Sequence, residues 1–272
     1  MKVSVIVTVL NEVKTIKPLL DSLFEQTLTP GEIIVVDAGS TDGTLEMTTI
    51  VRSIVVKGAN RSKARNEAIK LAKSQIIAVT DAGCIADKHW LERLTKPFKD
   101  KQVLSVAGYY RPITKTLFQK NVARFVAVMP DKFNLKTYLP SSRSLAFRKG
   151  AAWYPEQLNY CEDLIFAQQL KAAGQMAVAK NALVYWRQAE NRRQFFWQIF
   201  HYAQGDVRAR YRPHLIKIST VWLRYLLLLI WPPLFLIYLF WVGVIKKVSV
   251  EIQLIADLAV MSGSLSAIIL KR

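Results

Sequence analysis

The first eighty residues alternate between short β-branched runs and segments whose apolar positions recur every three or four residues. Apolar runs of four to seven residues favour buried strands, and a period of 3.6 favours amphipathic helices. The pattern predicts strands over Val3–Val9, Glu32–Asp37, Ile54–Lys57 and Ile76–Thr80, and helices over Lys14–Phe24 and Ser62–Lys73. Apolar strands that alternate with helices are typical of an α/β fold, a Rossmann-like and mainly parallel sheet flanked by helices.

Two long apolar stretches follow near the end of the chain. The 21 residues from Tyr225 to Ile245 carry no charge, and about 20 apolar residues suffice for a helix to cross a bilayer. Trp231-Pro232-Pro233 lies inside this stretch and should kink or break the helix. We predict a domain over residues 1–217 and a membrane segment over 218–272, with a two-helix hairpin of 222–245 and 252–270. The first stretch is expected to be a transmembrane or re-entrant segment, and the second, which Asp257 interrupts, is a weaker candidate for a span that could instead lie in the interface or pack on the first. Two buried core helices are the alternative.

The charge of the chain supports contact with a membrane surface. The 272 residues carry 38 Lys and Arg against 20 Asp and Glu, and residues 191–272 alone carry 11 basic and 3 acidic side chains. A basic amphipathic helix over 191–217 leads directly into the apolar run, an arrangement that attracts anionic lipids of the cytoplasmic leaflet. No nucleic-acid-binding motif accompanies the charge, so nucleic acid is not an expected partner.

Two cysteines, Cys84 and Cys161, are too few for a disulfide framework and are expected to pack as small buried residues. The first residues lack a signal-peptide layout and run directly into the first strand. We therefore expect the first domain to fold in the cytosol.

Each predicted strand ends in a polar cluster: Thr8–Glu12, Asp37–Thr44, Gly58–Arg61 and Asp81–Cys84. Any one of them has an ordinary explanation, since Asp, Ser, Gly and Thr are common turn and N-cap residues. Their recurrence indicates more, because parallel α/β sheets bind ligands at the carboxyl ends of their strands. We predict a binding site at this edge.

Six ordered blocks resemble family 2 glycosyltransferases of the GT-A fold. These blocks are VIVTVLNE, DAGSTDGT, ARNEAI, VTDAGC, SLAFRKGA and CEDLIFAQQLKAAG, and the resemblance covers about residues 1–190. It implies that a nucleotide diphosphate sugar is the donor. The residues that it assigns to the donor pocket are Val9, Asn11, Glu12, Asp37 for the base, Gly39, Arg65, Asp81 and Ala82.

The resemblance also places Asp81 at the first position of the DxD metal motif of the family, which implies Mg2+ or Mn2+ as cofactor. The second position holds Gly83, so Asp81 binds the metal alone, or Asp87 or His201 assists. A divalent cation stabilises a departing diphosphate as a Lewis acid. Metal binding is therefore expected, with an incomplete motif.

Asp163 stands at the catalytic-base position of the family, at the start of a predicted helix over Leu164–Ala173. A carboxylate there can take the proton of the attacking hydroxyl, although acidic residues also favour helix N-termini electrostatically. Its neighbour Glu162 is expected to point elsewhere. The QxxRW signature of processive synthases is missing after Gln188, which favours a non-processive enzyme.

Together these features predict an inverting, membrane-anchored glycosyltransferase of the inner or plasma membrane, with its catalytic domain in the cytoplasm. The donor is a UDP-, GDP- or dTDP-sugar, and the acceptor is a hydroxyl of a lipid-linked or envelope glycan. The alternatives are a sugar nucleotidyltransferase and a non-catalytic protein that binds nucleotide sugars. A hairpin of the two apolar stretches would leave Lys246 and Lys247 across the membrane and return Lys271 and Arg272.

Overall fold

The structure, a computed structural model, describes residues 1–129, 133–134, 137–246 and 248–270. The chain divides into two compact units. The first comprises Met1–Ile113 with Phe133–Arg187, and the second comprises Thr114–Lys132 with Gln188–Arg272. The predicted first domain, residues 1–217, therefore extends into the second unit.

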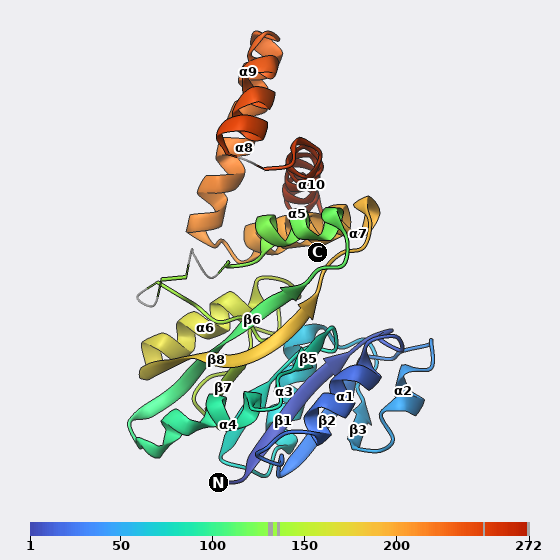
Figure 1. The fold of residues 1–272 in the computed structure, drawn as a ribbon, viewed down its shortest axis with the longest axis vertical. Helices are drawn as coiled ribbons and strands as arrows, with labels where there is room; N and C mark the ends of the chain where they lie inside the picture. The colour runs from blue at the N-terminus through green and yellow to red at the C-terminus, as the bar shows by residue number, and fades with distance from the viewer. Residues whose placement is uncertain (130–132, 135–136, 247, 271–272) are drawn as a thin grey trace. The chain divides into compact units, whose positions relative to one another are not determined.

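A single mixed sheet forms the centre of the first unit (Figure 1). Its strands are β1 (Val3–Val9), β2 (Glu32–Asp37), β3 (Arg52–Val55), β4 (Ile76–Val79), β5 (Cys84–Ala86), β6 (Val103–Ile113), β7 (Leu145–Arg148) and β8 (Gln175–Arg187). They lie in the order β3-β2-β1-β4-β7-β6-β8-β5. The first four are parallel to one another, and β7 is antiparallel to both β4 and β6.

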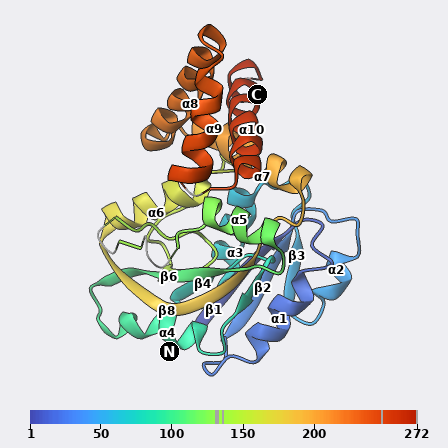
Figure 2. The ribbon, with the colours of Figure 1, turned by 45° about the horizontal axis from the view of Figure 1, so that its top comes forward.

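Helices cover both faces of this sheet. They are α1 (Ile16–Phe24), α2 (Thr44–Met47), α3 (Arg61–Leu71), α4 (Trp90–Thr95), continued by a 3-10 turn over Lys96–Lys99, and α6 (Glu162–Ala173). Figures 1 and 2 show α1 and α4 on one face and α3 and α6 on the other. On the second face, Ile6, Ile34 and Val36 pack with side chains of α3 and α6. The fold prediction is confirmed.

The predicted strands Val3–Val9 and Glu32–Asp37 have their predicted bounds. The third strand begins two residues earlier than predicted, at Arg52. It is an edge strand whose first residues are polar, so no apolar alternation marks its start. Helix α3 begins after Asn60, whose side chain accepts a hydrogen bond from the Lys63 N–H and so caps the helix.

The second unit consists of helices. These are α5 (Leu117–Val126), α7 (Arg192–Arg208), α8 (Arg212–Ile230), α9 (Leu234–Phe240) with a π-helical turn over Trp241–Ile245, and α10 (Val250–Ile269). The core of the unit joins side chains of α5, α7 and α10, among them Val122, Phe195 and Ile252. By length and composition, α8 and α10 are each apolar enough to cross a membrane.

Helix α10 packs along α7. Arg192 at the start of α7 pairs with Glu251, and Gln204 near its end donates a hydrogen bond to Ser266 at 3.2 Å. Between them Gly263 lies against the backbone of Phe200, where an added Cβ would come within 2.2 Å of the carbonyl oxygen. The two helices therefore run in the same direction, and only a residue without a side chain fits at this contact.

The predicted break at Trp231-Pro232-Pro233 is confirmed, since α8 ends at Ile230 and α9 begins at Leu234. The sequence places a hairpin between the two apolar stretches. In the structure a tight turn lies inside the first stretch, and α9 runs back beside α8 (Figure 2). The predicted positions of Lys247, Lys271 and Arg272 lie outside the described residues.

Candidate active site

The loops after β1 and β2 are tied to each other at the carboxyl edge of the sheet. The Asn11 N–H donates to the Ser40 hydroxyl at 2.9 Å, and the Asn11 side-chain oxygen accepts from the Thr41 N–H at 3.0 Å. Asn11 has a φ of 57°, in the left-handed region that Asn tolerates better than most residues. One step along, the Glu12 N–H donates to the Thr44 hydroxyl at 2.7 Å. The sequence-predicted residues of both loops therefore meet here.

Asp37, the last residue of β2, is completely buried beneath these loops. Its Oδ1 accepts the N–H groups of Gly39 and Ser40 at 2.7 and 2.6 Å. Its Oδ2 is buried and has no hydrogen-bond partner in the described part of the chain. Buried acceptors are rarely left unpaired, so a water or a ligand is expected to pair with this oxygen.

Gly39 allows the chain to turn directly above Asp37. Its φ of +105° is unfavourable for any residue with a side chain, and an added Cβ would lie 3.2 Å from Cγ of Lys57. Val9 and Ala82, also predicted to line this pocket, are buried with exposures of 3% and 2%. Both side chains are therefore packed inside the protein beneath the carboxyl edge and do not project into solvent.

Arg65, on α3, forms an ion-paired bridge between two carboxylates. Its Nη2 donates to Asp81 Oδ1 at 2.9 Å and its Nη1 to Glu162 Oε1 at 2.7 Å. The side chains of Arg65 and Glu162 are buried, whereas that of Asp81 is 31% exposed. Asp81 is thus the one member of the bridge that a ligand can reach.

Burial and charge set the protonation of this group. Burial raises the pKa of Asp81, but the cations Arg65 and Arg143 outweigh it and hold the pKa below its ordinary value. Burial also raises the pKa of Glu162; Asp163 raises it further, and the pairing with Arg65 does not fully offset this. Asp81 is therefore a stable anion, while Glu162 binds a proton more readily than an ordinary glutamate.

Burial is likewise the main reason that the pKa of Glu12 is raised, with the nearby charge of Asp81 adding to the shift. The Thr15 hydroxyl donates a hydrogen bond to the Glu12 carboxylate and acts in the opposite direction. Glu12 thus lies close enough to Asp81 for the two charges to interact.

Asp163 occupies the first turn of α6 and is partly exposed. Its Oδ1 accepts the Leu164 N–H at 2.9 Å, which leaves the other carboxylate oxygen for different partners. Burial raises the pKa of Tyr154, and the charges of Asp163 and Asp81 both add to this effect. The two carboxylates therefore act on one neighbouring hydroxyl.

The expectation that Glu162 points elsewhere is wrong. Glu162 is buried in the ion pair with Arg65, because α6 begins at Glu162 and turns this side chain toward α3. Arg143 is a further residue of this site that was not predictable from the sequence. Its guanidinium lies 3.8 Å from the centre of the Trp186 ring and 5.3 Å from that of Tyr110. The local signal in the sequence is weak: Arg143 stands between Ser142 and Ser144, directly before the apolar residues Leu145–Phe147.

Asp87 and His201, the two residues predicted as possible second metal ligands, have other contacts. Asp87 follows β5, at the opposite end of that strand from Asp81, and accepts hydrogen bonds from the His89 N–H and Arg93. His201 belongs to α7 in the second unit and stacks on Trp197. Cys84 and Cys161 are buried, and burial raises the pKa of Cys84 to about 12, as expected of a packing residue.

Within the described residues, no group of three or more His, Cys, Asp or Glu side chains is arranged to hold a metal ion. Mg2+ is nevertheless commonly held by one or two carboxylates together with phosphates of the substrate. The partly exposed anion Asp81 fits a metal shared with a diphosphate, and it does not fit a site formed by the protein alone.

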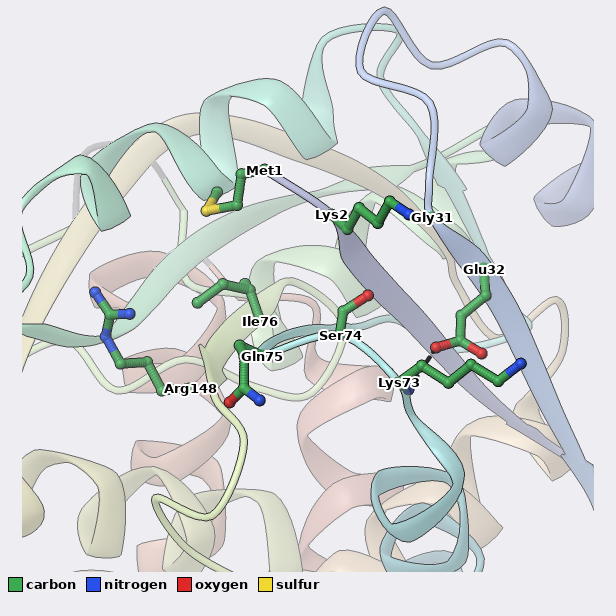
Figure 3. A pocket seen from close by; sticks show the side chains of 9 residues that line it. All are labelled: Met1, Lys2, Gly31, Glu32, Lys73, Ser74, Gln75, Ile76 and Arg148. Carbon is green, nitrogen blue, oxygen red and sulfur yellow. Dashed lines mark hydrogen bonds between the residues drawn. The ribbon is translucent and has the colours of Figure 1, made fainter.

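A separate pocket lies at the opposite edge of the sheet (Figure 3). It is lined by Met1, Lys2, Gly31, Glu32, Lys73, Ser74, Gln75, Ile76 and Arg148. Glu32 is engaged there in structural bonds, from the Ser4 hydroxyl and the Lys73 N–H, each at 2.6 Å. None of the predicted site residues lines this pocket, so the carboxyl edge remains the candidate active site.

The sheet order and the loops at its carboxyl edge define a protein of the GT-A class. Residues 4–156 match the model of the family described as Glycosyl transferase family 2, and the chain belongs to this family. The chain is thus a glycosyltransferase.

Two curated relatives come from Salmonella. The O-antigen chain rhamnosyltransferase RfbN of Salmonella typhimurium is 25% identical over 228 residues, which are 74% of this chain and 73% of RfbN. The O-antigen chain rhamnosyltransferase WbaN of Salmonella anatum is 27% identical over 203 residues, which are 65% of this chain and 64% of WbaN.

Solved structures share the fold. The mannosyltransferase PcManGT from Pyrobaculum calidifontis, in complex with GDP-Man and Mn2+, has a TM-score of 0.67 at 17% identity, covering 98% of this chain and 87% of that one. S. aureus TarS 1-349 in complex with UDP has a TM-score of 0.56 at 22% identity, covering 75% and 64%. The chain spans less than two thirds of the length of WbaN and of this TarS chain.

Proposed function

We propose that this glycosyltransferase transfers a sugar, with inversion, from a nucleotide diphosphate sugar to a hydroxyl of a lipid-linked or envelope glycan at the cytoplasmic face of a membrane. The names of the Salmonella relatives support rhamnose as the sugar and an O-antigen-type glycan as the acceptor. The titles of the solved structures, which name UDP and GDP-Man, support a nucleotide-linked donor.

The observation that carries the proposal is the unpaired Oδ2 of Asp37. This buried acceptor lies beneath the loops at the carboxyl edge, where parallel sheets bind nucleotides. An N–H group of a pyrimidine or guanine base would complete its hydrogen bonding. Oδ1 already holds the loop, so the two oxygens have separate tasks, one structural and one for the ligand.

Asp37→Asn is expected to weaken donor binding about 10- to 100-fold, because a hydrogen bond to a charged group contributes about 1.5–3 kcal/mol. The amide keeps one oxygen for the loop but replaces the charged acceptor. Calorimetric titration with nucleoside diphosphate measures the effect. Asp21→Asn, on the exposed face of α1, is the matched control and should leave the affinity unchanged. Equal affinities of Asp37→Asn and wild type would remove Asp37 from the base pocket.

In the proposed transfer, Asp163 acts on the acceptor and Asp81 acts on the donor. The acceptor oxygen forms a bond to the anomeric carbon as the bond from that carbon to the diphosphate oxygen breaks, and the diphosphate keeps the electron pair. The proton of the acceptor hydroxyl passes to Asp163. Attack from the side opposite to the leaving group inverts the anomeric centre.

A divalent cation, when bound, supplies Lewis-acid stabilisation of the departing diphosphate. Asp81 would hold it, with the diphosphate completing the coordination. Arg65 fixes one oxygen of Asp81 in place, and the nearby Arg143 adds positive charge on this side of the site.

Gly83→Asp is expected to tighten metal binding, because it restores a second carboxylate beside Asp81. The position has room, since an added Cβ meets nothing closer than Trp186 Cδ1 at 4.0 Å. We expect the Mn2+ concentration that half-restores activity after EDTA treatment to fall about tenfold. Gly83→Asn, which has the same shape without the charge, should change it far less. Wild-type activity that persists fully in EDTA would contradict the metal role of Asp81.

A panel of nucleotide sugars given to the detergent-solubilised full chain tests the function. Release of nucleoside diphosphate with sugar transfer supports the proposal. Exchange of pyrophosphate without transfer would indicate a sugar nucleotidyltransferase instead. Binding without turnover would indicate a non-catalytic protein that binds nucleotide sugars.

A further inference from the structure

Helices α8 and α9 form a hairpin with an unusually apolar surface. Its most exposed large side chains lie around the turn, where Leu229, Ile230 and Leu236 are 79%, 71% and 72% exposed. No charged residue occurs from Tyr225 to Ile245. Exposed apolar surface of this extent marks a contact with a membrane or another protein.

The two arms are held antiparallel by a specific contact. Arg224, six residues before the end of α8, donates from Nη1 to the Tyr238 hydroxyl of α9 at 3.1 Å. Six residues along a helix span about 9 Å, so this bond requires α9 to fold back beside α8. Figures 1 and 2 both show α9 returning along α8.

The N–H groups of the turn are suited to surroundings without water. The carbonyl groups of Trp231, Pro232 and Pro233 accept N–H groups three residues further on, at 3.1, 2.9 and 3.2 Å. The prolines have no N–H of their own, and the Trp231 N–H is bonded to the Leu227 carbonyl at 3.0 Å. Unsatisfied N–H groups are costly in a bilayer, and from Trp231 to Leu236 every N–H is either bonded or absent.

The positions of the lysines set the depth to which the hairpin can enter. Lys217 lies 13 residues before Ile230, and Lys246 lies 13 residues after Pro233, so the two exposed lysines end arms with the same number of residues. At 1.5 Å per residue each arm is about 20 Å long, against about 30 Å for the hydrocarbon core of a bilayer. If α8, with 19 residues and a length of about 28 Å, crossed completely, the return arm of about 20 Å would leave Lys246 inside the hydrocarbon.

The one charged residue between Lys217 and Lys246, Arg224, is neutralised by Asp257 of α10. Asp257, 2% exposed, accepts hydrogen bonds from Arg224 at 3.1 Å and from Gln253 at 2.9 Å. The hydroxyls of Tyr225 and Tyr238 also donate to it. Ionisable groups in membrane segments are tolerated when they pair with one another in this way. The cluster therefore lets Arg224 lie deeper than the lysines and ties the hairpin to α10.

We propose that residues 217–246 form a re-entrant hairpin that enters one leaflet of the bilayer and returns to the face from which it came. Lys217 and Lys246 then lie at the same lipid headgroups, where anionic lipids attract them. This proposal rests on the membrane association included in the proposed function. The sequence leaves a transmembrane and a re-entrant segment open, and the proposal selects the re-entrant one, so that Lys246 does not lie across the membrane.

Single cysteines in the full chain, in a Cys84→Ala, Cys161→Ala background, test the topology. The positions are Ile216 at the first foot, Leu229 beside the turn and Ile245 at the second foot, all strongly exposed in the second unit. We expect an impermeant maleimide to label positions 216 and 245 in inside-out vesicles and neither in sealed right-side-out vesicles. Position 229 should react in neither. Labelling of 216 and 245 from opposite sides would overturn the proposal, because α8 would then cross.

Charge substitutions give an independent measurement that does not need the cysteine background. Leu229→Asp should reduce partitioning into anionic liposomes by about 100-fold, because Asp deep in a membrane helix costs about 3 kcal/mol. Ile216→Asp, equally accessible in the folded unit, should reduce it far less. Equal effects of the two would contradict insertion of the turn.

Alkaline extraction of the cell membranes separates the proposals. Wild-type protein should stay in the membrane pellet. Release into the supernatant would refute both the hairpin and the membrane association, yet would leave the nucleotide-sugar assay to decide the transferase activity. Retention in the pellet with labelling of position 245 from the other side would refute the hairpin alone.

Discussion

Asp163→Asn is expected to lower the rate of sugar transfer by about 100- to 10,000-fold, the range typical of a lost general base. The amide keeps the size of the side chain and its hydrogen bond to the Leu164 N–H, but it cannot take the acceptor proton. Donor affinity should stay close to that of wild type. Single-turnover kinetics together with calorimetric donor binding would separate the two quantities.

Glu92→Gln is the matched control, because Glu92 is also an acidic residue in the first turn of a helix but is 59% exposed and far from the carboxyl edge. It should keep full activity. Glu162→Gln is not a neutral comparison, since it disrupts the ion pair with Arg65. If Asp163→Asn kept more than about a tenth of the turnover while Glu162→Gln lost it within the general-base range, the base would be Glu162.

Arg65→Met should cost about 3–5 kcal/mol in the free energy of unfolding, because removing one partner of a buried ion pair leaves the other uncompensated. Glu162 is the buried partner, and Asp81 can still reach solvent. Urea denaturation of the solubilised protein, followed through the buried Trp90 of the first unit, measures the loss.

The control for this change is Arg52→Met. Arg52 forms a longer pair of 3.5 Å with Glu32, and its side chain is 40% exposed. Exposed pairs contribute less than about 1 kcal/mol, so the expected loss is several-fold smaller. Similar losses in both variants would mean that the Arg65 bridge contributes no more than a surface pair.

The first four strands were predictable because each is a short apolar run between helices with a clear period. The strands β6 and β8 were not, although they are the longest of the sheet. Strand β8 mixes exposed Lys180 and Asn181 with buried Ala182, and its pairing with β6 shifts in register between Ala107 and Tyr109. Such irregular strands are specified by their neighbours across the sheet, and a local pattern does not reveal them.

The candidate site was predictable to a similar degree. Asp37, Asp81 and Asp163 stand out because acidic residues follow strands or begin a helix. The bridge from Arg65 to Glu162 joins residues 97 positions apart, and the stacking of Arg143 on Trp186 joins the turn before β7 to β8. Contacts of this kind arise from the tertiary fold. The resemblance of the sequence blocks therefore assigned Arg65 to the donor pocket but did not indicate that Arg65 also pairs with Glu162.

Because one guanidinium holds both Asp81 and Glu162, the two ends of the active site are thermodynamically linked. A ligand that draws Asp81 away from Arg65 strengthens the hold of Arg65 on Glu162, at the start of the helix that carries Asp163. Linkage of this kind is reciprocal: the factor by which a proton on Glu162 changes the affinity for a ligand at Asp81 equals the factor by which that ligand changes the proton affinity of Glu162. Under the proposed function, donor capture and the placement of the base are thus coupled through three side chains.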